Sequence, residues 1–117
     1  MTFEFITDYF KDPENLDLLK PEDIINSLKT KDAIIIDVRT EFEYNSGHIK
    51  SALNYPLGHE KSIEKEIPKN ARIILICKTG HRSRAAANRL TRLGYKNLAH
   101  LVGGMDLWKK RNFPVVK

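Results

Sequence analysis

Residues 73–94, IILICKTGHRSRAAANRLTRLG, decide the fold of this chain. The apolar residues 73–76 are typical of a buried strand, and from Arg84 apolar residues recur at helical spacing until Gly94, which suits a left-handed helix end. A strand, a short polar loop and a helix therefore follow one another, with Cys77 at their junction. Backbone N–H groups and the positive end of the helix dipole converge at such a junction, which favours an anion.

The surroundings of Cys77, the only cysteine, indicate a reactive thiolate. A lone cysteine is more often a small buried hydrophobe, but this one ends a predicted strand at the edge of the sheet where ligands of α/β proteins bind. Lys78, Arg82 and the N–H groups of the helix start would each stabilise the nucleophilic thiolate. A helix dipole contributes only about 0.3–1 kcal/mol, so direct N–H hydrogen bonds and a close cation are needed as well.

The rest of the chain alternates predicted strands and helices after an opening segment without a clear pattern. We expect strands at 33–38, 51–57, 72–77 and 98–101, and helices that begin at Pro21, run from the Thr40/Glu43 capping box to Gly47, and span 59–67, 83–93 and 105–111. This order predicts an α/β fold of three layers, in which helices cover both faces of a mostly parallel sheet of about five strands. The carboxyl ends of the strands then share one rim.

Length and composition are those of one globular domain. The chain has 117 residues, of which 41% are hydrophobic and 30% charged, and we expect a single domain over residues 1–117 with residues 1–15 as an N-terminal extension. No apolar run of bilayer length and no signal-peptide pattern is present, so we expect a cytoplasmic protein. The net charge of +5 suits small anionic substrates, whereas nucleic-acid binding is not favoured because no aromatic residues interleave the arginines.

A few polar residues outside the loop are candidates for the same site. Asp37 and Arg39 share a strand face, and a structural ion pair between them is favoured over contact with substrate. His48 and His81 raise the possibility of a metal, but the four histidines lack ligand spacing, so no metal and no cofactor is expected. Gly103-Gly104 predicts a close backbone approach.

Three segments, read together, resemble a single-domain rhodanese, a thiosulfate-type sulfurtransferase. They are IIDVRTEFEYNSGHIKSALNYPL (35–57), the loop CKTGHRS (77–83) and LVGGMDLWKKRNFPV (101–115). The resemblance covers the chain from about Leu18 to Val115 and rests on the order and spacing of the three segments. It implies the rhodanese fold and a persulfide on Cys77, which takes sulfur from a donor such as thiosulfate and passes it to a thiol or to cyanide.

The resemblance also assigns roles within the loop. It implies that the backbone N–H groups of the loop surround the transferred sulfur and that basic loop residues hold the donor anion. The implied substrate-binding residues are Lys78, Thr79, Gly80, His81, Arg82 and Ser83, with Asp37, Arg39 and His48 as supporting residues. Many rhodaneses have arginine where this chain has Lys78, which keeps the charge but lacks the bidentate fork and predicts weaker binding of thiosulfate.

Two other functions stay open at this point. The first is a persulfide carrier or binding module that serves a specific protein acceptor in a sulfur relay. The second is a phosphatase or arsenate reductase, which the same fold also supports. The loop from Cys77 to Arg82 has six residues, whereas a phosphatase would need arginine at the next position, which is Ser83. A phosphoryl group requires a wider ring of donors than one terminal sulfur, so loop length favours sulfur transfer.

Overall fold

A parallel sheet with the strand order β1-β5-β4-β2-β3 organises the computed structural model, which describes residues 15–117. The strands are β1 (Leu16–Leu19), β2 (Ile34–Asp37), β3 (Leu53–Asn54), β4 (Ile73–Ile76) and β5 (Leu98–Leu101). The helices are α2 (Pro21–Thr30), α3 (Glu41–Ser46), α4 (Glu60–Glu66), α5 (His81–Arg92) and α6 (Gly104–Lys110). The predicted α/β class and five-strand parallel sheet are confirmed. Across residues 15–117, no helix combines the length and the apolar composition needed to cross a bilayer.

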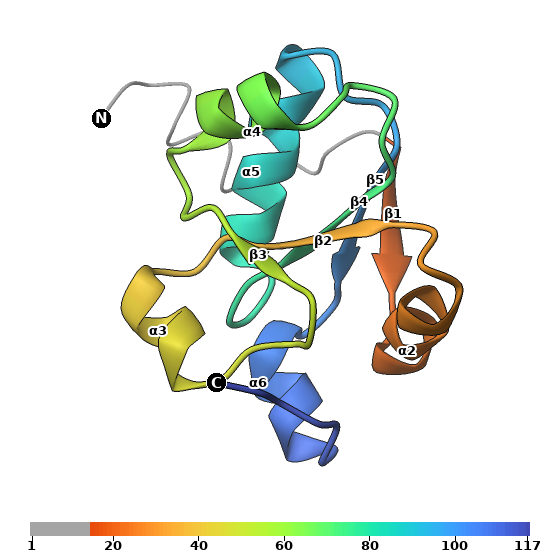
Figure 1. Ribbon diagram of the computed structural model, residues 1–117, viewed down its shortest axis with the longest axis vertical. Helices are drawn as coiled ribbons and strands as arrows, with labels where there is room; N and C mark the ends of the chain where they lie inside the picture. The colour runs from red at the N-terminus through yellow and green to blue at the C-terminus, as the bar shows by residue number, and fades with distance from the viewer. Residues whose placement is uncertain (1–14) are drawn as a thin grey trace.

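Helices cover the two faces of the sheet, giving three layers (Figure 1). Ile73 and Leu75 of β4 pack in one core cluster with side chains of α4 and α5. Ile74 and Ile76, which alternate with them, pack in the other cluster with side chains of α2 and α6. All four residues of β4 are buried, as the continuous apolar run predicted. Cys77 belongs to the α4/α5 cluster and lies beyond the end of this central strand.

The largest differences from the sequence-based expectation concern β1, β3 and the start of α5, and the other boundaries shift by at most one residue. Strand β1 was not predicted, because LDLL is short and partly exposed and its pairing with β5 is a tertiary contact. The expected strand at 51–57 contracts to β3, although the N–H groups of Tyr55 and Leu57 still donate to the carbonyls of Asp37 and Val38. Helix α5 begins at His81 rather than Ser83. The expected extension at residues 1–15 falls outside the described residues except for Asn15.

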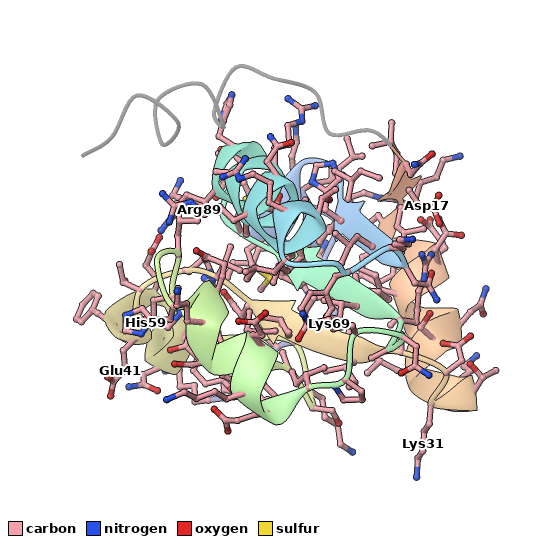
Figure 2. The ribbon with its side chains drawn as sticks, turned by 90° about the horizontal axis from the view of Figure 1, so that it is seen from above. Asp17, Lys31, Glu41, His59, Lys69 and Arg89 are labelled. Carbon is pink, nitrogen blue, oxygen red and sulfur yellow. The ribbon has the colours of Figure 1, made fainter. Side chains whose placement is uncertain are left out.

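Polar contacts join α4 to α5 and the segment that follows it. Figure 2 shows Arg89 of α5 and His59, just before α4, on the same side of the molecule. Arg89 Nη1 donates to Oε1 of Glu60 over 3.1 Å, and the buried hydroxyl of Tyr95 lies 2.5 Å from the carbonyl oxygen of Ile67 and 3.1 Å from that of Ile63. These contacts hold the C-terminal half of α5 and the residues after it against α4.

The start of α6 packs directly against the backbone that follows β4. The N–H groups of Met105 and Asp106 donate to the carbonyls of Cys77 (2.8 Å) and Lys78 (3.0 Å). A Cβ atom on Gly104 would lie 2.4 Å from the Cys77 carbonyl oxygen, so only glycine fits there. The close backbone approach expected at Gly103-Gly104 is therefore confirmed at Gly104.

We expect Gly104→Ala to destabilise the protein by at least about 3 kcal/mol, because the added Cβ overlaps backbone atoms that cannot move aside as a flexible side chain would. Gly58→Ala is the matched control: Gly58 also has a positive φ, of 104°, but nothing lies within 4 Å of its Cβ position. That control should lose only about 1–2 kcal/mol, the cost of placing alanine in a backbone conformation with positive φ. Urea denaturation of both variants gives the two values, and equal losses would show that the approach of α6 to the loop is not tight.

Candidate active site

Cys77 is held inside a turn that its own loop forms. The N–H of Gly80 donates to Sγ of Cys77 over 2.8 Å, and the cysteine is 1% exposed. Gly80 reaches this position with φ 114°, a left-handed conformation that favours glycine, and α5 begins at the next residue. The N–H groups at the helix start and the sulfur are thus brought to one place, an arrangement that stabilises negative charge on sulfur.

Ser83, in the first turn of α5, is the second polar partner of the sulfur. Its buried hydroxyl lies 3.4 Å from Sγ of Cys77 and donates to the carbonyl of Gly80 over 3.1 Å. The hydroxyl also lies 2.8 Å from Nδ1 of His100, which comes from β5. A connected set of polar groups therefore lies beneath the loop.

Both loop cations are paired with carboxylates, which the sequence did not indicate. Arg82 makes a bidentate contact with Glu43 of α3, with distances of 2.6 and 2.9 Å. The ammonium of Lys78 lies 3.0 Å from Oδ2 of Asp106 on α6. The Arg82 pair is about three-quarters buried, whereas both members of the Lys78 pair are more than half exposed. The geometry of Arg82 is accordingly the better defined of the two.

The Arg82 contact dominates the ionisation of Glu43. Hydrogen bonds from the guanidinium lower the pKa of Glu43 from 4.5 to about 2, although burial of the carboxyl acts in the opposite direction. The backbone N–H of Thr40 adds to the lowering, because Thr40 and Glu43 form the predicted capping box of α3. The same carboxylate thus begins α3 and orients a loop arginine.

The loop residues Thr79 and His81 are exposed, and their side chains contact each other. Thr79 Oγ1 lies 3.1 Å from Nδ1 of His81. A depression of about 160 Å³ opens beside the loop, between α3 and α6, and its lining includes Glu43, Lys78 and Asp106. Both carboxylates that pair with the loop cations therefore line this depression.

Asp37 and Arg39 form a buried ion pair behind the rim. Arg39 Nη2 lies 2.8 Å from Oδ2 of Asp37 and also donates to the carbonyl of Gly47 at 2.8 Å. The side chains are 0% and 4% exposed. His48 stacks on Tyr44 with ring centroids 3.7 Å apart and pairs through its backbone with Val116. These residues hold α3 and the C-terminal segment in place.

Three residues of the site were missed in the sequence. Glu43 was recognised only as a capping residue, and nothing near Asp106 indicated its pairing with Lys78. His100 carries a weak signal, since it is the one polar residue in the buried strand LAHL. Within residues 15–117, no group of three histidine, cysteine, aspartate or glutamate side chains is placed to hold a metal ion.

Comparison with known proteins gives a consistent result. Residues 20–111 match the family of the rhodanese-like domain. A sulfurtransferase of Allochromatium vinosum is 33% identical over 87 residues, which cover 74% of this chain and 81% of that protein. An adenylyltransferase and sulfurtransferase of Ogataea parapolymorpha is 32% identical over 85 residues, which cover 69% of this chain but only 22% of that longer protein.

A solved structure shares the fold. The crystal structure of a rhodanese-related protein from Thermoplasma volcanium superposes with a TM-score of 0.75 and 29% identity. The match covers 86% of this chain and 97% of that one. The arrangement of strands and helices around the Cys77 loop is therefore one that solved proteins also have.

We expect Glu43→Gln to lower the free energy of unfolding by about 1–2 kcal/mol near neutral pH, a range that allows for the partial exposure of the pair. Because the folded state lowers the pKa of Glu43, its stabilisation is present above pH 4.5 and is lost as the pH falls to about 2. The difference in the free energy of unfolding between wild type and variant should therefore shrink as the pH falls from 4.5 to about 2. Denaturation at a series of pH values measures it, with Glu41→Gln in the same helical turn as control. A difference that is constant with pH would contradict the assignment.

Proposed function

Because this chain belongs to the rhodanese-like domain family, we propose that it is a sulfurtransferase that carries a sulfane sulfur as a persulfide on Cys77. The observation that carries the proposal is the hydrogen bond from Gly80 N–H to Sγ, 2.8 Å long, at the start of a helix. That contact stabilises the thiolate, and a thiolate is what attacks a sulfur donor. Relatives named as sulfurtransferases support the reaction class.

The reaction has two displacement steps at sulfur. The thiolate of Cys77 attacks the outer sulfur of the donor, and the bond from that sulfur to the rest of the donor breaks, with its electron pair leaving on the donor fragment. With thiosulfate the fragment is sulfite. An acceptor nucleophile such as cyanide or a thiol then attacks the outer sulfur of the persulfide, and Sγ leaves as the thiolate. The N–H of Gly80 stabilises the charge on Sγ in each step.

The proposed donor is a small anion such as thiosulfate, with Arg82 and Lys78 as its cationic partners. Each of the two cations already contacts a carboxylate, so a donor must compete with Glu43 and Asp106. Arg82 retains its planar fork for an oxyanion once Glu43 is displaced, which Lys78 lacks. Arg82 is therefore the principal donor-binding residue of the proposal.

A persulfide carrier for a protein acceptor is the second candidate. The observation in its favour is the same pairing of the loop cations, because Glu43 and Asp106 reduce the positive charge that a dianion meets at the loop. A protein donor or acceptor would deliver or remove sulfur by docking rather than by charge alone. The two candidates share the Cys77 persulfide and differ in which donor loads it faster.

We expect Cys77→Ser to reduce sulfur transfer from thiosulfate to cyanide by roughly a thousandfold or more, because a serine hydroxyl cannot form the persulfide. Thiocyanate formation measures the rate. The serine variant should still unfold cooperatively, since serine is close to cysteine in size and its hydroxyl can accept the hydrogen bond from the N–H of Gly80. Turnover like that of the wild type in the serine variant would refute the mechanism, and hydrolysis of an aryl phosphate faster than sulfur transfer would refute the reaction class.

Replacing Arg82 with alanine should raise the KM for thiosulfate by roughly tenfold or more, which corresponds to one lost charge-assisted contact. Arg82→Lys should recover less than half of this effect on a logarithmic scale, because lysine restores the charge without the fork. Arg92→Ala is the matched control, since Arg92 is an exposed arginine in the last turn of the same helix. If Arg92→Ala and Arg82→Ala change the KM equally, the effect comes from the net charge of the protein, and Arg82 does not contact the donor.

A further inference from the structure

His100 is a buried histidine placed beneath the Cys77 loop. It lies in β5, where it pairs in register with Leu75 of the neighbouring β4, and it is 1% exposed. The ring lies close to Gly80, since its Cε1 atom is 3.8 Å from the position that a Cβ of Gly80 would take. Strand β5 therefore presents its one polar side chain to the residue that donates to the sulfur.

A line of hydrogen-bonding atoms runs from the sulfur to this ring. Sγ of Cys77 lies 3.4 Å from Oγ of Ser83, and Oγ lies 2.8 Å from Nδ1 of His100. On the far side of the ring, Nε2 is buried and has no hydrogen-bond partner within the described residues. The only polar connection of this imidazole in residues 15–117 is therefore through Nδ1, toward the nucleophile.

The Ser83 hydroxyl has only one proton, and this limits which hydrogen bonds the polar groups between Cys77 and His100 can form at the same time. A hydroxyl has one proton to donate and can accept two hydrogen bonds. In the thiol state the hydroxyl can donate to the carbonyl of Gly80 and accept from the thiol. In the thiolate state the sulfur only accepts, so the hydroxyl must turn toward it. A histidine that accepted through Nδ1 would take that single proton and leave the thiolate without it.

We propose that His100 is a positioning residue for the Cys77 nucleophile: as the neutral imidazole with its proton on Nδ1, it donates to Ser83 Oγ and so leaves the hydroxyl proton of Ser83 available to the sulfur. The inference rests on the proposed role of Cys77 as the nucleophile. On ionisation the thiol proton goes to water, and the Ser83 hydroxyl turns from the Gly80 carbonyl to Sγ. No proton is transferred to His100.

The environment of His100 explains why it acts as a donor and not as a base. Burial, and to a smaller extent the charge of Arg84, lower the pKa of His100 to about 4. A second proton would sit on Nε2, where no acceptor is within reach among the described residues. The ring therefore stays neutral through the physiological range, and its hydrogen bond to Ser83 does not change with pH there.

Other charged groups around the loop could also move the titration of the sulfur. Those on the elements packed around it are Lys78 in the loop, His81, Arg82 and Arg84 on α5, Glu43 on α3, Asp106 on α6, Asp37 at the end of β2 and Arg39 after it. The experiment below leaves all of them in place. A change in the titration of the Cys77 thiol can then be assigned to the hydrogen bonds that connect Cys77, Ser83 and His100.

The test compares His100→Leu, which fills the site without a donor, with His100→Asn, whose amide nitrogen can donate at about the position of Nδ1. The readout is the ultraviolet absorbance of the thiolate as a function of pH, which is clean because Cys77 is the only cysteine, with Cys77→Ser subtracted as background. We expect the midpoint to rise by about one pH unit in His100→Leu and to stay within about 0.3 units of wild type in His100→Asn. An unchanged midpoint in His100→Leu, or a rise of equal size in folded His100→Asn, would overturn the proposal.

A measurement on the wild type keeps the proposal falsifiable where a variant fails to fold. Nitrogen-15 chemical shifts of the His100 ring distinguish a protonated Nδ1 from a protonated Nε2. We expect a neutral ring with the proton on Nδ1 at pH values near neutral, and a proton on Nε2 would overturn the proposal. Neither measurement uses sulfur transfer, so a wild type that ionises as expected but transfers no sulfur would refute the proposed function and leave the role of His100 standing.

Discussion

The hydrogen bond from Gly80 N–H to Cys77 Sγ, 2.8 Å long, is the contact around which the other elements are arranged. It requires the left-handed conformation of Gly80, and that conformation in turn lets α5 begin at the next residue. On the opposite side, α6 bonds the carbonyl of Cys77 and leaves room only for glycine at residue 104. The short loop is thus fixed by a helix on each side of its backbone, so its N–H donors are in place before any ligand arrives.

Charge at the site is balanced rather than simply positive. The net charge of +5 suggests an open anion site, yet the loop cations Arg82 and Lys78 contact carboxylates of α3 and α6. Such pairs orient the cations and make any incoming anion compete for them. The neutral dipoles of the loop backbone are then the donors that act on the sulfur without competition. Specificity for a donor would follow from how readily it displaces Glu43, which ties the choice of substrate to the start of α3.

Sequence reasoning recovered the parts of the structure that depend on local pattern. The buried strand before Cys77, the capping box of Thr40 and Glu43, and the alternation of strands with helices all follow from periodicity and caps. The parts it missed depend on tertiary contacts. Strand β1 exists through its pairing with β5, and the pairing of Glu43 with Arg82 joins residues 39 positions apart. His100 appeared as one polar residue in an apolar strand, and only the register of β5 against β4 places it under the loop.

A persulfide on Cys77 can be detected in the intact mass of the wild-type protein. After incubation with thiosulfate and removal of excess donor, we expect a mass increase of one sulfur atom, located on the peptide that contains Cys77 and removed by cyanide. Loading by a cysteine desulfurase with its substrate, in place of thiosulfate, would give the same product and favour the carrier role. If neither donor adds sulfur to folded protein in which Cys77 is shown to be reduced, then Cys77 does not carry a persulfide.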